Sequence, residues 1–222
     1  MIVWAMRKYF PDLTRFLEVG CDTGFVLAAI REALPHLQVM GSELYAEGLE
    51  VARRRLPGVP LVQMDALDIR FAGTFGAVGV FDVLEHIEED ETVLRELGGA
   101  VAPGGGLLVT VPQHPRLWSA ADDFAGHVRR YTRRELVNKA GKAGWEPLRV
   151  TSFVSLPLPF LALSRALRAR SGETYEFERE FRLPKSLDMS LEALMSGERA
   201  LLTRGVSFHA GASLLLVARR AQ

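Results

Sequence analysis

The sequence predicts an α/β fold in which a mostly parallel β-sheet carries helices on both faces. Short β-type runs alternate with helical patterns along residues 16–154, which is typical of that architecture. One run, 107–111, consists entirely of apolar or β-branched residues, as expected of a buried strand. Of the 222 residues, 48% are hydrophobic and 24% are charged. The chain can therefore bury a full core, which excludes disorder, collagen and coiled coil.

Each expected element is bounded by residues that end strands or helices. The expected strands are 16–19, 37–43, 61–64, 77–81, 107–111, 148–154 and 213–218. The expected helices are 25–34, 47–56, 89–101 and 132–143. Gly20 ends the first strand, Pro35 stops the first helix, and Pro-Gly-Gly-Gly at 103–106 predicts a turn before the fifth strand. Thr132, with Glu135 three residues later, predicts a capping box at the start of the last of these helices.

The segment 155–212 separates the last two expected strands. It is too long for a plain loop in a compact domain, and it contains helical patterns near 160–170 and 191–204. We therefore expect a helical insertion that forms a lid within a single domain spanning 1–222.

Charge and cysteine content exclude several classes of protein. The chain has 27 basic and 27 acidic side chains, so its formal net charge is zero. A neutral chain does not favour a nucleic-acid partner. The charges are nevertheless uneven, since residues 1–111 hold 9 basic and 16 acidic side chains, and residues 112–222 hold 18 and 11. Cys21 is the only cysteine, so a disulfide scaffold and a cysteine-based zinc cluster are excluded, and we expect no metal.

The sequence is expected to belong to a cytoplasmic protein. The N-terminus lacks the charged and apolar regions of a signal peptide. The longest charge-free apolar run of the second half, 151–164, has fourteen residues. A membrane-spanning helix needs ~20 apolar residues.

A glycine-containing loop, Glu-Val-Gly-Cys-Asp-Thr-Gly at 18–24, joins the first strand to the first helix. Glycines at such a turn allow a ligand to lie against bare main chain at a helix N-terminus. The dinucleotide-binding pattern G-x-G-x-x-G is not met, because two of its three glycines are missing. An ordinary strand-to-helix turn is the alternative interpretation.

Two acidic residues follow the next two strands. Glu43, about twenty residues after Gly24, ends the second strand, where it can accept both hydroxyls of a ribose. Asp65, just past the third strand, can accept from an adenine amine. A single acid at a strand end is more often a helix cap or a solvated charge. Three such positions at successive strand ends favour a ligand, because ligands of open α/β sheets bind at that edge.

Taken together, these motifs resemble the class I S-adenosylmethionine-dependent methyltransferases over residues ~16–154. The resemblance rests on the segments 18–24, 41–44, 63–66, 81–87 and 97–112. It implies a Rossmann-like seven-stranded sheet with an antiparallel last strand, and S-adenosyl-L-methionine as cofactor across the first two strand ends. It also implies the donor-binding residues Glu18, Gly20, Cys21, Asp22, Gly24, Glu43, Leu44, Asp65, Ala66, Phe81 and Asp82.

Asp22 departs from the family, which usually has glycine at this position. Aspartate tolerates left-handed backbone angles better than most residues, so the turn is expected to survive. Its carboxylate could hold the ammonium of the donor or repel the donor's carboxylate. We expect donor binding to be retained.

Methyl transfer from a sulfonium needs alignment, exclusion of water and, for an acceptor that carries a proton, a general base. His86, just after the fourth strand, is a candidate base, with a capping or packing role as the alternative. The connection after the fifth strand is expected to overhang the active cleft. It supplies His127 and Tyr131 as further catalytic candidates, and His114, Trp118 and Arg130 as acceptor-binding candidates. A solvated basic helix start is the alternative there.

The predicted function is methyl transfer to a small-molecule or lipid-like acceptor. The first alternative is a non-catalytic module that binds the donor or a nucleotide. An oxidoreductase is disfavoured by the missing glycines.

The apolar run within 153–170 ends in the arginines Arg165, Arg168 and Arg170. This pattern suits peripheral contact with an anionic membrane surface. The alternatives are a lid packed on its own domain or on a partner subunit, as in a homodimer.

Overall fold

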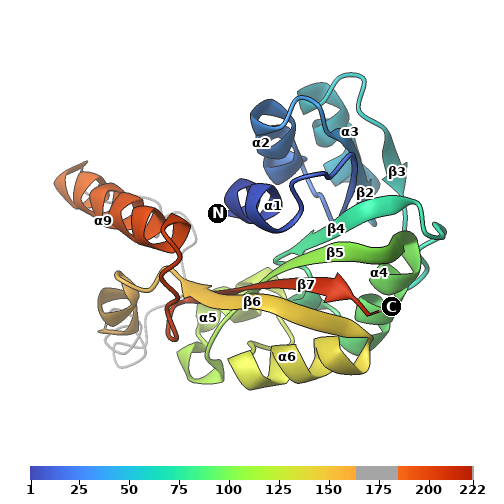
Figure 1. The fold of residues 1–222 in the computed structure, drawn as a ribbon. Coiled ribbons are helices and arrows are strands. Elements are labelled where there is room, and N and C mark those ends of the chain that lie inside the picture. The colour runs from blue at the N-terminus through green and yellow to red at the C-terminus, as the bar shows by residue number, and fades with distance from the viewer. Residues whose placement is uncertain (164–184, 222) are drawn as a thin grey trace.

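The computed structural model describes residues 1–163 and 185–221 (Figure 1). Its seven-stranded sheet has the order β3-β2-β1-β4-β5-β7-β6. The strands are β1 (Arg15–Val19), β2 (Gln38–Glu43), β3 (Leu61–Gln63), β4 (Phe75–Phe81), β5 (Val101–Pro112), β6 (Trp145–Phe153) and β7 (Ser213–Arg220). Strand β7 is antiparallel to both β5 and β6, while the pairs among β1 to β5 are parallel. The predicted mostly parallel sheet with an antiparallel last strand is confirmed.

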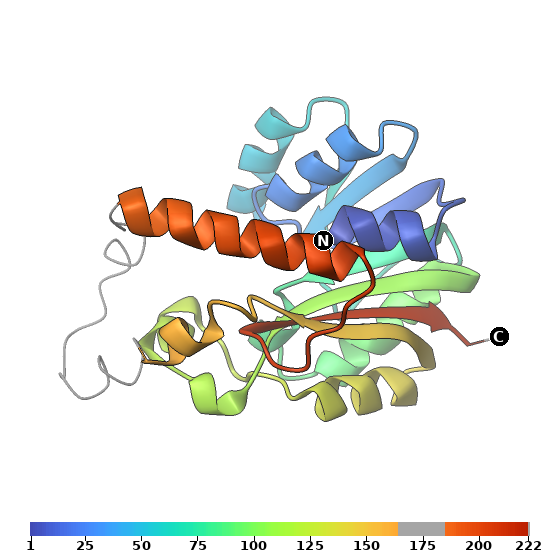
Figure 2. The same ribbon diagram turned by 60° about the vertical axis from the view of Figure 1, so that its left-hand side comes forward.

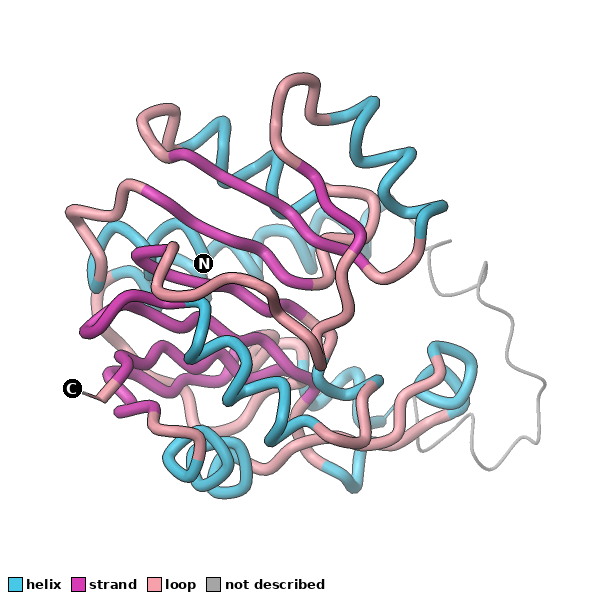
Figure 3. Tube along the Cα trace, turned by 90° about the vertical axis from the view of Figure 1, so that its right-hand side faces the viewer, coloured by secondary structure: helices cyan, strands magenta, loops and turns pink. Residues whose placement is uncertain are grey.

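Helices cover both faces of this sheet (Figures 1 and 3). The α-helices that precede the insertion are α1 (Ile2–Tyr9), α2 (Phe25–Ala33), α3 (Ala46–Arg55), α4 (Asp90–Ala100), α5 (Ala120–Ala125) and α6 (Arg133–Lys142). Two short 3-10 helices, η1 (Leu84–His86) and η2 (Pro115–Leu117), follow β4 and β5. Helices α1, α2 and α3 lie on one side of the sheet, and α4 and α6 lie on the other. This is the layered arrangement that the alternating pattern predicts.

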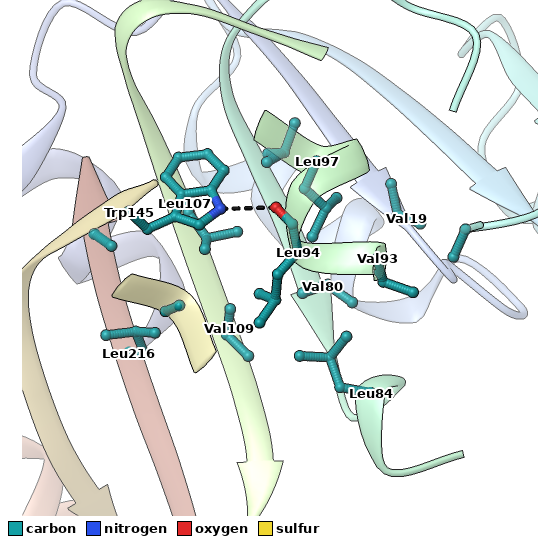
Figure 4. Packing of buried hydrophobic residues seen from close by; sticks show 14 of the residues in the cluster. Val19, Val80, Leu84, Val93, Leu94, Leu97, Leu107, Val109, Trp145 and Leu216 are labelled. Carbon is teal, nitrogen blue, oxygen red and sulfur yellow. Dashed lines mark hydrogen bonds between the residues drawn. The ribbon is translucent and has the colours of Figure 1, made fainter. Parts of the chain in front are cut away.

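Each face has its own hydrophobic core. On the side of α4 and α6, Trp145 is 2% exposed and its indole N–H donates to the carbonyl of Leu94 at 2.8 Å (Figure 4). This bond satisfies the one polar atom of a large buried aromatic side chain. On the other side, Met6 from α1 joins Phe16 from β1 and Leu27 from α2. The two cores fix the sheet, and with it the positions of the loops at its edges.

Two features differ from the sequence-based prediction. Helix α1 was not expected, and it packs on the sheet through Ala5 and Met6. Strand β5 begins at Val101, so the glycine-rich run 103–106 lies inside the strand and is not a turn before it. The register with β4 shifts there and Gly104 has φ +75°, as in a β-bulge that the glycine permits.

The described part of the insertion comprises a helical turn at 158–163 and helix α9 (Lys185–Thr203). Figures 1 and 2 show α9 extending from the end of the sheet at which β6 finishes. Glu198 is 1% exposed and accepts two backbone bonds of 2.8 Å, from the N–H groups of Ser155 and Leu156, which ties α9 to the chain leaving β6. Most of the expected helix 160–170 lies outside the described residues, and the lid remains a prediction. Among the described helices, none combines the length and apolarity required to cross a membrane.

Candidate active site

The glycine loop adopts the tight conformation that its sequence predicts. Gly20 and Gly24 have φ +73° and +74°, and Asp22 between them has φ +43°. The amide N–H groups of Gly20 and Cys21 both donate to the carbonyl of Ser42 at 2.9 Å, which holds the loop against β2. A Cβ atom on Gly20 would overlap the Cγ2 atom of Val83, in the turn after β4. The loop therefore lies between the ends of β2 and β4.

The side chain of Asp22 packs toward helix α3. A Cβ atom on Gly48, in the first turn of α3, would lie 3.1 Å from the Oδ1 atom of Asp22. The carboxylate thus lies beside a helix N-terminus, where negative charge is favourable. This orientation gives the aspartate a local partner, so its presence in place of glycine is compatible with an intact loop.

Glu43 connects the glycine loop to the turn after β2. Its side chain is largely buried, and its carboxylate accepts from the backbone N–H groups of Asp22 (3.0 Å), Leu44 (2.8 Å) and Tyr45 (3.0 Å). A carboxylate offers about four lone-pair positions, so these bonds leave one. Accepting both hydroxyls of a ribose would therefore require the carboxylate to release at least one backbone bond.

Asp65 and Ala66 lie next to this site, after β3. The N–H of Met64 donates to the carbonyl of Glu43 at 3.0 Å, which brings the two strand ends together. Asp65 is exposed, and its Oδ1 atom accepts from the N–H of Leu67 at 2.9 Å. This bond closes a local turn and caps no helix, since none of the described helices lies between β3 and β4. Contact of Asp65 with an adenine amine stays a prediction.

Glu18, in β1 beneath the loop, is a buried carboxyl. It is 2% exposed, and its Oε2 atom has no hydrogen-bond partner within the described chain. Burial raises the pKa of Glu18 to about 8. A cationic group arriving at the loop, such as the ammonium of an amino acid, would offset this unfavourable burial.

Glu18→Gln is expected to remove a pH dependence of stability between pH 4.5 and about 8. In this window the folded chain holds a proton that the unfolded chain has released, so the free energy of unfolding falls as the pH rises. The slope is up to about 1.4 kcal/mol per pH unit. Glutamine keeps the shape but cannot ionise, so the variant should lose this slope. Urea denaturation across the window measures it, with the exposed Glu32→Gln as matched control. Equal slopes in Glu18→Gln and wild type would contradict the assignment.

The turn after β4 carries the next group of predicted residues. Phe81 is buried at the end of the strand, and Asp82 follows in the left-handed region at φ +52°. The N–H of Asp82 donates to the carbonyl of Thr110 at 2.9 Å, which fixes the turn to β5. Asp82 is exposed at the same edge of the sheet as Glu43, because β4 and β2 both flank β1 in parallel.

Two predicted catalytic histidines meet after this turn, although 41 positions separate them. The ring centroids of His86, in η1, and His127, after α5, are 4.8 Å apart with their planes at 82°. His127 Nδ1 lies 3.0 Å from Asp122 Oδ1. Burial and the neighbouring His127 lower the pKa of His86. A neutral histidine at this edge can accept a proton.

Glu85 is a site residue that sequence analysis did not single out. It is 1% exposed, burial raises its pKa to about 8, and its carbonyl accepts from the N–H of Val128 at 2.8 Å. That backbone bond holds the segment containing His127 against η1. Its position directly before the predicted catalytic residue His86 was the only sign in the sequence that Glu85 belongs to this site.

Tyr131 and Arg130 are buried and bonded within the protein, which favours structural roles for both. Tyr131 has no exposed surface, and its hydroxyl donates to Asp90 at 2.6 Å. Arg130 is 7% exposed and its guanidinium donates to Asp122 at 2.6 Å and to the carbonyl of Gln113 at 3.0 Å. Their predicted roles at the acceptor stay predictions, and contact with an acceptor would require these internal bonds to rearrange.

His114 lies at a pocket of about 480 Å³. The pocket is lined by His114, Pro115, Arg116, Leu117, Thr132, Leu158 and Ala162. His114 has φ +63°, and its Nε2 atom is buried without a hydrogen-bond partner among the residues described. Trp118 is 39% exposed, and its indole N–H donates to Asp123 at 2.9 Å. The pocket joins the connection after β5 to the start of the insertion.

The described geometry defines an α/β protein with a candidate ligand site at the carboxyl ends of β1, β2 and β4. The chain belongs to the methyltransferase-domain family, whose match covers residues 4–150. Members of this class use S-adenosylmethionine, and the sequence-based identification of the family and its cofactor is confirmed.

Three similar proteins illustrate the relationship. The chain is 34% identical over 97 residues to a ubiquinone biosynthesis O-methyltransferase of Chromobacterium violaceum, which covers 41% of each protein. It is 31% identical over 110 residues to a trans-aconitate 2-methyltransferase of Acidovorax sp., covering 49% of this chain and 42% of the relative. The fold matches an S-adenosylmethionine-dependent methyltransferase from Mesorhizobium loti with a TM-score of 0.62 at 19% identity, over 97% of this chain and 96% of that one.

The alignments with the curated relatives span only about half of their length, or less. The family match at residues 4–150 contains the predicted donor-binding residues. The acceptor must therefore be argued from this chain's own residues.

Proposed function

We propose that this protein transfers a methyl group from S-adenosylmethionine to a hydroxyl oxygen of an aromatic or lipid-like small molecule. The observation that supports the donor most strongly is the convergence of the glycine loop, Glu43 and the turn at Asp82 on one edge of the sheet. Glycine at position 20 lets the loop pack directly against Val83, where any side chain would overlap. The Oε2 atom of Glu18, beneath the loop and without a hydrogen-bond partner among the described residues, suits the ammonium group of the donor.

The chain's own residues have distinct tasks in this proposal. Glu43 binds the ribose after releasing a backbone N–H, and the glycine loop holds the methionine part of the donor. When bound, the donor supplies an activated methyl group on a sulfonium. His86 and His127 lie after β4, where one of them can accept the proton of the acceptor hydroxyl.

The pocket beside His114 favours an apolar acceptor. Leu117, Leu158 and Ala162 contribute apolar surface, and the buried His114 Nε2 offers one polar contact. Small-molecule sites typically combine an apolar lining with a few such polar groups. The relative named as a ubiquinone biosynthesis O-methyltransferase is consistent with an oxygen acceptor.

Methyl transfer is tested by formation of S-adenosylhomocysteine. The purified protein is incubated with S-adenosylmethionine and a panel of hydroxylated aromatics, isoprenoid phenols and unsaturated carboxylic acids, and the products are measured by mass spectrometry. We expect a methylated product from the hydroxylated compounds. We also expect turnover in His127→Ala to be at least about tenfold slower. A general base typically contributes about a hundredfold or more, and the neighbouring His86 can replace part of that contribution.

The same assay separates the alternatives. Donor binding without turnover on any acceptor would favour the non-catalytic donor-binding module. Neither binding nor turnover would contradict the proposal entirely.

Contact of 153–170 with a membrane, and a homodimer, stay predictions. Phe160 and Leu163 are 70% and 59% exposed, so the described part of the run presents apolar surface. The arginines Arg165, Arg168 and Arg170 lie outside the described residues. Flotation with anionic vesicles tests the membrane contact.

A further inference from the structure

Glu85 and His86 in η1, together with His127 after α5, place possible metal-ligand atoms close together. One oxygen of Glu85 and one ring nitrogen each of His86 and His127 lie within 4.8 Å of one another. The Oε2 atom of Glu85 is buried, and no described residue bonds to it. We propose that Glu85, His86 and His127 bind a divalent transition-metal ion, contrary to the expectation from the sequence that the protein holds no metal.

His127 is already oriented as a metal ligand is. His127 Nδ1 faces Asp122 Oδ1 at 3.0 Å, so Nδ1 carries the proton and Nε2 keeps its lone pair. The His86 ring packs edge-on against the ring of His127, with the ring centroids 4.8 Å apart. A carboxylate or carbonyl that holds the second ring nitrogen is the usual companion of a ligating histidine.

The burial of Glu85 gives an independent reason for a cation. A carboxyl that is 1% exposed and has an unbonded oxygen can be ionised there only if a positive group lies beside it. The nearby guanidinium of Arg130 is already bonded to Asp122 at 2.6 Å and to the Gln113 carbonyl. Asp82, three residues before Glu85 in the turn after β4, adds a further negative charge to the same neighbourhood. A divalent ion would compensate both acids.

The ligand set selects the kind of metal. Two imidazoles and one carboxylate suit Zn²⁺, Mn²⁺ or Fe²⁺, which bind in this combination with coordination positions left open. Mg²⁺ prefers oxygen ligands and retains its waters, so it should bind more weakly. We therefore expect Zn²⁺ and Mn²⁺ to bind and Mg²⁺ to compete poorly.

The metal would act on the acceptor, a step that rests on the proposed function. Histidines bound to the metal cannot also act as the general base, so the metal takes over this role. An open coordination position can bind the acceptor hydroxyl and lower its pKa, so that the hydroxyl releases its proton to water. The resulting oxygen forms a bond to the methyl carbon as the carbon–sulfur bond of the donor breaks, and that electron pair stays on sulfur. The products are the methyl ether and S-adenosylhomocysteine. The proximity of Asp82 to both sites places the acceptor next to the donor.

Direct metal binding tests the site without donor or acceptor. Untagged full-length protein is stripped with a chelator and titrated with Mn²⁺, Zn²⁺ and Mg²⁺, using calorimetry and the electron paramagnetic resonance of free Mn²⁺. We expect about one equivalent of Mn²⁺ or Zn²⁺ to bind. Binding should weaken at least tenfold in His127→Ala and in Glu85→Gln, while His36→Ala, an exposed histidine elsewhere, should bind as wild type does.

The controls separate folding, site and function. Thermal melting identifies a Glu85→Gln variant that fails to fold, and the partly exposed His127→Ala then decides the outcome. A wild-type protein that binds no metal, or equal binding in His127→Ala, would overturn the inference. Turnover that persists in metal-free protein would support methyl transfer as the function and would show that the metal has no role in it. Metal binding without methyl transfer to any acceptor would support the metal site and refute the proposed methyltransferase function.

Discussion

Gly20→Ala is expected to weaken binding of S-adenosylmethionine by more than tenfold. The residue has φ +73°, and its new Cβ atom would overlap Val83 Cγ2 at the point where the glycine loop meets the turn after β4. The left-handed conformation alone disfavours alanine by about 1 kcal/mol. Relief of the overlap would displace the loop or the turn, and both are predicted to hold the donor. Calorimetric titration with the donor measures the effect.

Two matched variants isolate the cause. Gly58 has a similar φ of +79° but open space around its Cα, so Gly58→Ala should show the backbone strain and retain donor affinity. The double variant Gly20→Ala with Val83→Ala removes the atoms that overlap and should recover part of the affinity. Wild-type affinity in Gly20→Ala would contradict the location of the donor.

Asp90→Ala is expected to lower the free energy of unfolding by about 3–5 kcal/mol. Asp90 is 3% exposed and accepts from the Tyr131 hydroxyl (2.6 Å), Lys139 Nζ (2.6 Å) and Arg129 Nη1 (2.9 Å). Burial opposes ionisation, but the bonds from Lys139 and Tyr131 hold the pKa of Asp90 below its ordinary value. Alanine would leave a hydroxyl and two cations without their shared partner. Urea denaturation measures the loss.

The adjacent Glu91 provides the control. It pairs with Lys142 at 3.3 Å in a largely exposed position, so Glu91→Ala should change stability by no more than ~1 kcal/mol. The network of Asp90 also anchors the segment that carries His127, and Asp90→Ala should therefore slow methyl transfer as well. Similar losses in the two variants would refute a special role for the buried network.

The donor side of the fold was predictable because its signals are local. Three local signals mark it: the strand end at Gly20, the left-handed turn at Asp22 and the acid Glu43 at the end of the next strand. Each signal can be read from the few residues around it. Parallel strand pairing then brings them together. Helix α1 escaped prediction because eight residues hold too short a periodic pattern, and its place depends on packing through Met6.

The acceptor side was only partly predictable, since it depends on contacts between distant segments. Tyr131 and Arg130 read as polar loop residues, and only the fold shows that Asp90 and Asp122 bury them. His86 and Glu85 were adjacent in the sequence, but the approach of His127 follows from the bond between Val128 and Glu85 across the loop. Sequence spacing alone carried no sign of this meeting.

A crystal structure of the protein bound to S-adenosylhomocysteine tests the central claim most directly. The account predicts that the adenosine lies over the ends of β1 and β2, with the Glu43 carboxylate turned from the Asp22 amide to the ribose and the amino group of the ligand near Glu18. A ligand bound elsewhere, with Glu43 still holding its three backbone amides, would contradict it.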